Sequence, residues 1–488
     1  MKATDSIHRR LWVALGLAAL LPAIAMAEFT LDVEVIGKGE IALTPETGPY
    51  AEGTEVTLTV HPELRHALAG WRGDASGQAD EIIVTMDADK SIRAEFGKIV
   101  IVGPHQYVFG AATPSLARRF TTEGHFISGD DLSLYYVKIR YDRLPQTVTS
   151  IFRVTRPDIN APWGEPVDLM KDNVNAGLNY NWAMKPSLTD DGLKLCYLSI
   201  QVANPGAWPT ASRWLAVYRA SLEEEFDFSE PEQLGPPAWD DEAGPGSITR
   251  DGTGFIYTSD REGGSSEGAI WYTDWDPNGF AIGDPTLVAA DPGNRYTRPE
   301  MSADGLTVMF WNPGSPHTIY MVARASVDDP WGAAVSLPAP IALGREHFAS
   351  MSSDMTKIYF DSHRPGTTPI DPRDPRGPPP GGPGLDIFEA KMRRLSFPSV
   401  VLTTDSDRYG KGGEAVLTPV IGKSDLTIAR VEYYEGDTFI GESLEMPFSF
   451  IWPILGNGPY ELTARAFDDA GDSALSETVR ITVGGRAR

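Results

Sequence analysis

The chain has almost no cysteine: Cys196 is the only one among 488 residues. A single thiol cannot close an intramolecular disulfide, so the fold depends on apolar burial and hydrogen bonds. Cys196 lies in the apolar run Leu195 to Leu198, and we expect it to be a buried core residue.

Basic residues are also scarce. There are 42 Lys and Arg against 67 Asp and Glu, which gives a formal net charge of −25. A nucleic-acid-binding surface needs a basic footprint, so this balance argues against a nucleic acid partner.

Long apolar runs are missing except at the N-terminus. There, Arg9 and Arg10 precede the apolar stretch Leu11 to Ile24, and Ala25-Met26-Ala27 follows as a small-x-small cleavage site. Residues 1–27 therefore predict an export signal, with a twin-arginine signal and a retained anchor as alternatives. We expect an exported protein, periplasmic or extracellular, with no membrane span in the mature chain.

Turn residues are abundant, with 48 Gly and 39 Pro, and they punctuate five repeats between about Phe120 and Leu395. The clearest copy runs from Pro299 to Phe310 and centres on Ser302-Ala303-Asp304-Gly305. The other anchors are Ser128, Thr189, Thr249 and Ser352, at intervals of about 50–60 residues. Asp-Gly between two strand-like runs predicts a type I′ hairpin turn. Two copies lack this Gly, at Asp131 and Met355, so we expect their turns to differ.

Each repeat continues with a third apolar run, and most carry a weaker fourth run. Four strands per unit is the composition of a β-propeller blade. The last repeat lacks a fourth run, whereas an unmatched one, Phe109 to Leu116, precedes the first repeat. We expect this segment to pair with the last blade and close the ring, which removes an exposed sheet edge. The fold class is then all-β, with five blades, or six if one is too degenerate to detect.

The pattern Pro-x-x-Ser-x-Asp-Gly-x-x-x-x-Phe at Pro299 to Phe310 resembles the WD-like repeats of TolB-type propellers, as do Tyr257 to Gly264 and Asp361 to Gly366. The resemblance covers about 275 residues. It implies a propeller over residues 99–396 that binds a protein or another ligand, and it brings no catalytic residues with it.

Two smaller modules flank this region. Residues 28–97, with Gly70-Trp71-Arg72-Gly73-Asp74 and the strand-like run to Phe96, resemble an internalin B-type bacterial repeat. Residues 398–485, with Val431 to Tyr434 and Tyr460 to Asp468, resemble a bacterial immunoglobulin-like β-sandwich. The first module carries Asp74, Asp80, Asp87 and Asp89, whose spacing fits no EF-hand loop, so we interpret them as turn caps rather than calcium ligands.

Candidate binding residues follow from the propeller geometry. Loops that lead into the innermost strands, and loops that join second to third strands, emerge on one face, which we call the loop-bearing face; the Asp-Gly turns lie on the opposite face. Binding residues concentrate on loops held by a rigid scaffold. The polar and aromatic candidates on the loop-bearing face are His125, Trp182, Trp208, Trp239, Glu242, Arg295, Arg298, Glu346 and His347.

Three catalytic or metal hypotheses deserve comparison. Gly264-Ser265-Ser266-Glu267-Gly268 matches a nucleophile elbow, but it joins two strands where an elbow needs a strand and a helix. His125, His347 and His363 share the loop-bearing face, which is weak support for a metal site. Glu242, Glu300 and Glu346 could supply the paired carboxylates of a propeller glycosidase. None matches a motif, so we expect no cofactor, no metal and no catalytic residue.

The sequence thus favours a non-catalytic, exported binding protein whose propeller holds a protein or a cell-envelope glycan. The alternatives are a carbohydrate-active hydrolase or lyase, and a structural spacer or adhesin-like surface protein. Clustered carboxylates in a central pocket would favour the enzyme. A spacer would leave the centre of the ring filled with apolar side chains.

Overall fold

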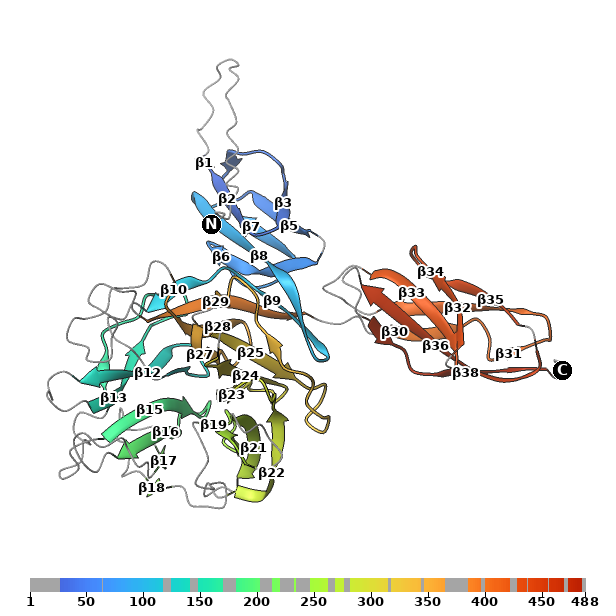
Figure 1. Ribbon diagram of the computed structural model, residues 1–488. Helices are drawn as coiled ribbons and strands as arrows, with labels where there is room; N and C mark the ends of the chain where they lie inside the picture. Colours follow the sequence, from blue (N-terminus) through green and yellow to red (C-terminus); the bar gives the residue numbers. More distant parts are fainter. Residues whose placement is uncertain are drawn as a thin grey trace, which may run out of the picture. The chain divides into compact units, whose positions relative to one another are not determined.

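The computed structural model describes residues 27–63, 65–116, 124–140, 148–169, 181–201, 213–219, 232–233, 246–261, 268–275, 281–314, 317–343, 346–364, 385–395, 400–421, 428–436, 438–454, 456–468 and 473–484. These ranges contain strands and turns and no helix, so the predicted all-β class is confirmed (Figure 1). Accordingly, the described ranges hold no helix that could cross a bilayer. The predicted export signal lies outside them, apart from Ala27. The chain divides into two compact units, described separately below: residues 100–105 with 109–393, and the remainder.

The N-terminal module consists of short alternating strands around one tryptophan. They are β1 (Glu28–Phe29), β2 (Leu31–Ile36), β3 (Gly39–Thr44), β4 (Tyr50–Ala51), β5 (Glu55–Pro62), β6 (His66–Gly73), β7 (Glu81–Thr85) and β8 (Lys90–Val102). Strands β3, β5 and β7 form one sheet, and β8 pairs with β2 and β6. Every second residue of β5 is buried, as expected for a sheet with one covered face. The core centres on Trp71, which is fully buried and donates its indole N–H to the Ala79 carbonyl at 2.8 Å.

Two of the four aspartates of this module accept hydrogen bonds from residues distant in the chain. Asp89 accepts from the backbone N–H and the hydroxyl of Thr30, and Asp74 accepts from the Ser91 N–H. These bonds connect separate segments of the module and are not the local turn caps that we expected.

The C-terminal region forms two antiparallel-rich sheets. One contains β30 (Val400–Thr404), β32 (Glu414–Ile421) and β35 (Phe450–Pro453); the other contains β31 (Arg408–Tyr409), β33 (Ile428–Glu435), β34 (Thr438–Ser443), β36 (Gly458–Asp468), β37 (Ser473–Leu475) and β38 (Val479–Val483). Their inner faces share one core, in which Leu417, Tyr433 and Leu462 are fully buried. Such a shared core is the arrangement of a β-sandwich.

The first four repeats each supply four strands, and the last supplies three, which are joined by β10 from the segment before the first repeat. Their bounds are β11 (His125–Ile127), β12 (Ser133–Arg140), β13 (Val148–Thr155) and β14 (Val167–Asp168); β15 (Asn181–Leu188), β16 (Lys194–Gln201), β17 (Arg213–Arg219) and β18 (Glu232–Gln233); β19 (Gly246–Ile248), β20 (Gly254–Ser259), β21 (Ala269–Trp275) and β22 (Ala281–Ala289); β23 (Thr297–Met301), β24 (Thr307–Asn312), β25 (Thr318–Ala323) and β26 (Val335–Ser336); and β27 (Glu346–Met351), β28 (Lys357–Ser362) and β29 (Asp386–Leu395), joined by β10 (Thr113–Leu116). Strand β9 (His105–Phe109) precedes β10. Within each repeat, successive strands pair antiparallel.

The repeats form a closed ring, as a β-propeller requires. The first strands of successive repeats contact one another in the order β11, β15, β19, β23 and β27, and β27 contacts β11 again. Strand β10 pairs antiparallel with β29, with Thr113 opposite Glu389 and Pro114 opposite Phe388 (Figure 1). The predicted closure by the segment before the first repeat is therefore confirmed.

The turns between first and second strands correct one expectation. All five share one conformation, with the third residue after each anchor Ser or Thr at positive φ: 60° at Asp131, 69° at Gly192, 73° at Gly252, 70° at Gly305 and 58° at Met355. Only this residue of each turn has a positive φ, and its N–H donates to the carbonyl of the anchor, as Gly305 does to Ser302 at 3.0 Å. A type I′ turn needs two such residues, so the predicted turn type is wrong.

A side-chain network enforces this shared conformation. In the fourth repeat the Ser302 hydroxyl donates to Asp304 Oδ1 at 2.6 Å, and the same carboxylate oxygen accepts from the Leu306 N–H at 3.0 Å. Equivalent bonds recur in the other four turns. Because the aspartate fixes the turn, Asp131 and Met355 adopt a backbone conformation that normally favours glycine. The expectation of different turns in these two repeats is therefore wrong.

A second irregularity recurs in four of the five repeats, four residues before the anchor, in the first strand or just before it; the same position of the third repeat lies outside the described residues. The residues there have positive φ: 118° at Gly124, 43° at Lys185, 58° at Arg298 and 26° at Phe348. The pairing register shifts at the last three of these positions. Bulges of this kind redirect side chains, and strained non-glycine residues concentrate at functional sites.

Candidate functional site

One arginine lies at the centre of the ring near the Asp-Gly face. The Arg250 side chain is 1% exposed. Its guanidinium donates to groups from all four other repeats: the Ile127 carbonyl at 3.2 Å, Asp190 Oδ1 at 3.1 Å, Ser353 Oγ at 2.9 Å, Glu300 Oε1 at 3.2 Å and the Met351 carbonyl. Arg250 therefore links the five repeats through one charged group.

Two further charged residues, Glu300 and Lys185, lie at the centre of the ring with Arg250. Glu300 is buried, and its Oε1 accepts from Arg250 Nη2 and from the Met351 N–H, both at 3.2 Å. Burial raises the Glu300 pKa, although Arg250 and Lys185 oppose this. Lys185 Nζ donates to the Pro299 carbonyl at 2.9 Å, and burial lowers its pKa to about 7 against the attraction of Glu300. The centre of the ring is thus polar, unlike the apolar filling expected of a spacer.

Nearer the loop-bearing face, His125 meets Asp361. Both side chains are fully buried, with His125 Nδ1 3.2 Å from Asp361 Oδ1. Neither imidazole nitrogen makes a hydrogen bond with any described residue. A buried polar atom without a partner is costly, so this histidine is a place where a ligand or a solvent molecule would be stabilised.

Imidazole, indole and guanidinium groups gather at the mouth of the ring on the loop-bearing face. We call Arg298, Trp311, His317, His347, Phe348 and His363 the mouth cluster. The His347 and Trp311 rings stack with centroids 4.8 Å apart, and His347 lies 5.6 Å from His317 and 5.4 Å from His363. The Arg298 guanidinium lies 4.0 Å from the Phe348 ring and 5.6 Å from the Trp311 ring. All except Phe348 are half-buried, so their edges reach the surface.

The environment of His347 predicts a pH-dependent stability. Burial lowers the His347 pKa to about 4, helped by His363, His317 and Arg298, while Asp361 opposes. The unfolded chain therefore binds the proton more tightly, and folded-state stability falls as pH drops from about 6.5 to 4. We expect the free energy of unfolding of His347→Gln to fall by about 1–3 kcal/mol less than that of the unmodified chain between pH 6.5 and pH 4. Unfolding measured at several pH values in both proteins would check it; parallel pH profiles would contradict the shifted pKa.

The structure brings together three of the residues predicted from the sequence: His125, Arg298 and His347. Glu346 adjoins them but is fully buried, with Oε1 3.3 Å from Arg364 Nη2, and Arg295 is exposed. Trp208, Trp239 and Glu242 lie outside the described residues, as does the segment Gly264 to Glu267 of the proposed elbow; for Trp182 only the backbone, in β15, is described.

Sequence reasoning missed Lys185, Arg250, Trp311 and His317. A signal existed for one of them, because Lys185 stands four residues before a turn anchor and is followed by proline, as the predicted Arg298 is. Aligning the repeats on their anchors would have paired these two cations.

The described carboxylates do not assemble a hydrolytic pair. A glycosidase needs two carboxyl groups that both reach the scissile bond. Glu300 and Glu346 are 1% and 0% exposed, and each faces a guanidinium. Within the described part of the chain, no group of three or more His, Cys, Asp or Glu residues could hold a metal ion.

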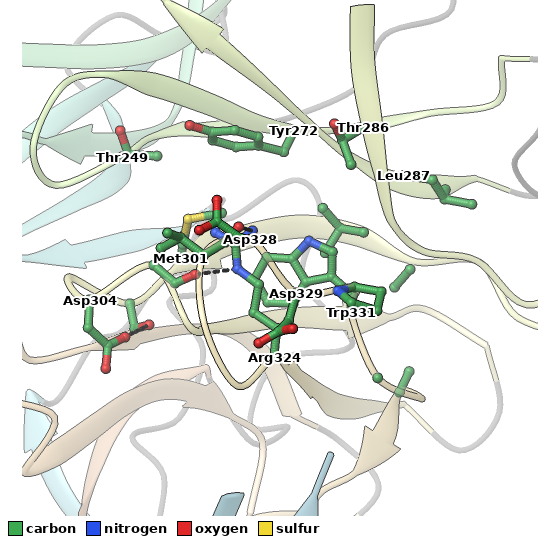
Figure 2. Close-up of a pocket in the computed structure, with 18 of the residues that line it drawn as sticks. Thr249, Tyr272, Thr286, Leu287, Met301, Asp304, Arg324, Asp328, Asp329 and Trp331 are labelled. Atoms are coloured by element: carbon green, nitrogen blue, oxygen red, sulfur yellow. Dashed lines mark hydrogen bonds between the residues drawn. The ribbon is translucent and has the colours of Figure 1, made fainter. Parts of the chain in front are cut away.

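A groove of about 1130 Å³ opens on the Asp-Gly face, between the third and fourth repeats (Figure 2). Tyr272 and Thr286 lie on one side, and Arg324 and Trp331 on the other, with the guanidinium 4.4 Å from the indole ring (Figure 2). Its turn carboxylates already serve the turns themselves, as Asp304 does, and Asp274 accepts from the Tyr272 hydroxyl at 2.7 Å. The acidic lining therefore has a structural explanation.

Comparison with known families identifies one part of the chain. Residues 29–100 match the family described as Divergent InlB B-repeat domain. This confirms the internalin B-type resemblance of the first module. No curated protein matches the chain.

Solved structures resemble separate parts of the chain. A putative TolB from Agrobacterium tumefaciens is 14% identical, with 71% of this chain and 89% of that chain covered and a TM-score of 0.27. An α-L-arabinofuranosidase from Lactobacillus brevis is 10% identical, with 58% and 95% covered and a TM-score of 0.35. Fibronectin(III)-like modules of Clostridium thermocellum CbhA are 26% identical, with 17% and 94% covered and a TM-score of 0.16. Likenesses this low identify neither a ligand nor a reaction.

Proposed function

We propose that this chain is an exported, periplasmic or extracellular binding protein whose repeats form a five-bladed, TolB-like β-propeller. The mouth cluster holds a protein or a cell-envelope glycan, and the divergent B-repeat and an immunoglobulin-like sandwich flank the propeller. The closed ring of five first strands and the four strands in each repeat support the blade count.

The observation that carries this proposal is the composition of the mouth cluster. Trp311 and His317 are half-buried, yet the indole Nε1 of one and the Nδ1 of the other are buried without a hydrogen-bond partner among the described residues. Rings with a polar handle are enriched where partners bind, because one side chain offers an apolar face and a directed hydrogen bond. A partner at the mouth would satisfy both atoms.

Two observations weigh against particular forms of the alternatives. The buried, ion-paired Glu300 and Glu346 argue against a hydrolase built on those two residues. The charged centre around Arg250 argues against a ring that serves only as a spacer, since folding stability alone is usually achieved better by apolar packing.

The proposal is tested by binding the full chain to arrays of cell-envelope glycans and envelope proteins. For whichever partner binds, we expect Trp311→Ala to weaken affinity at least about 30-fold, the loss typical of a central aromatic contact. Trp331→Ala is the matched control, because this half-buried tryptophan lies on the Asp-Gly face. Equal losses in both variants, or none in either, would show that the partner binds elsewhere.

A further inference from the structure

We propose that the group bound at the mouth is an anion, a carboxylate or a phosphate, on the ligand of the proposed function. This inference rests on that function and adds the chemistry that the site recognises. It follows from the donors, the charges and the strained backbone of the mouth cluster.

The first argument concerns hydrogen-bond donors. The atoms without partners among the described residues include Trp311 Nε1, which can only donate, the Thr318 hydroxyl beside His317, and His125 Nε2 below the mouth. Hydroxyl and imidazole groups can turn a donor toward an acceptor. An oxyanion offers several acceptor lone pairs at one point, so it would satisfy this set better than a neutral hydroxyl does.

The second argument concerns charge. The titratable groups that act on His347 are Arg298, His317 and His363 at the mouth and the buried Asp361 beneath them. Asp361 faces His125, and the nearby Glu346 is matched by Arg364. Arg298 is the permanent cation among the half-buried members of the mouth cluster, and it stands beside three imidazoles.

The third argument concerns placement. Arg298 has a φ of 58°, a conformation that costs a non-glycine residue free energy of about 1–3 kcal/mol. The bulge directs its guanidinium over Phe348 and Trp311 at the mouth, and a planar guanidinium matches the geometry of a carboxylate or phosphate.

The test is a calorimetric titration of the full chain with sodium glucuronate, inorganic phosphate and glucose, at about pH 5.5 and pH 8. We expect at least one anion to bind and glucose to bind at least ten-fold more weakly. Binding should differ little between these two pH values through His347, because its pKa of about 4 keeps this imidazole neutral at both. Arg298→Gln should weaken anion binding at least ten-fold, whereas Arg480→Gln, which makes the same charge change at an exposed site of the sandwich, should leave it unchanged.

Two further variants keep the result interpretable. Arg298→Lys should retain part of the anion affinity, and Trp311→Phe, which keeps a ring but loses the N–H donor, should reduce it even if Arg298→Gln does not fold. Binding of glucuronate alone or phosphate alone supports the inference and identifies the anion. Glucose binding as well as the anions, or no anion binding, overturns it.

The outcomes also separate this inference from the proposed function. If the partner from the binding screen depends on Trp311 but not on Arg298, the mouth is the site and the anion is wrong. If the partner depends on neither residue, both proposals fail.

Discussion

Replacing Arg250 by methionine is expected to destabilise the repeat region by about 3–5 kcal/mol, because it leaves the buried Glu300 carboxylate without its guanidinium partner. The same change removes hydrogen bonds to residues of all four other repeats. Hydrogen exchange, read peptide by peptide, should show the loss in β20 and β28, while peptides from β5 in the N-terminal module keep their protection.

A double-mutant cycle distinguishes loss of the charge pair from loss of packing. Glu300→Gln added to Arg250→Met should cost less than the sum of the two single changes, because the neutral amide no longer needs a cation. Arg480→Met, at an exposed guanidinium, should change stability by less than about 0.5 kcal/mol. Additive effects of the two central substitutions would mean that Arg250 stabilises the ring by packing alone.

The turns show how far the repeat pattern determines the fold. The anchor Ser or Thr and the Asp two residues later predict the hairpin in every copy, and the hairpins are present. The expectation failed where it relied on glycine. At Asp131 and Met355 the turn is fixed by the preceding aspartate, and the Asp131 carboxylate also lies 2.7 Å from Lys357 Nζ and 2.8 Å from Arg156 Nη2. Lys357 and Arg156 are distant from Asp131 in the chain, so the sequence of the turn alone could not predict these ion pairs.

The mouth of the ring was predicted only in part for a similar reason. Periodicity placed Arg298 and His347 on the loop-bearing face, because each precedes a first-strand run. Trp311 and His317 flank the connection from β24 to β25, where the sequence shows no unusual insertion. Their contribution depends on stacking with His347 from the next repeat, which is a contact between units rather than a property of one unit.

The buried polar groups of the centre were the least predictable. Glu300 was considered from the sequence as a catalytic candidate, yet its partner Arg250 follows the turn anchor Thr249 and would ordinarily be assigned to the surface. In the folded ring, the Arg250 side chain points to the centre, where it is buried and bonded to the other four repeats. As a result, the Asp-Gly side of the centre contains the ion pair of Arg250 and Glu300. Toward the loop-bearing face, His125, Trp311 and His317 each have a buried nitrogen without a hydrogen-bond partner among the described residues.

A disulfide across the closing strands should have the other large effect. Thr113 lies opposite Glu389 in the pairing of β10 with β29, so Thr113→Cys with Glu389→Cys would close a loop that spans the whole ring. Loop-closure entropy for so long a loop predicts a stabilisation of about 5 kcal/mol when oxidised, reduced by any strain in the new bond. Native Cys196 should not interfere, because it is fully buried and burial raises its pKa.

The measurement compares unfolding of the oxidised and reduced forms of the same variant, so the substitutions themselves cancel. Thr113→Cys with Lys391→Cys is the matched control: position 391 is a diagonal neighbour, about 7–8 Å from position 113 and beyond the usual reach of a disulfide. If the ring is closed as β10 and β29 indicate, the first pair should oxidise in the folded protein and the second should stay reduced. Oxidation of both pairs or of neither would mean that β10 does not pair with β29 in this register. The ring would then not be closed as described, and the mouth cluster, on which both binding proposals depend, would have no fixed geometry.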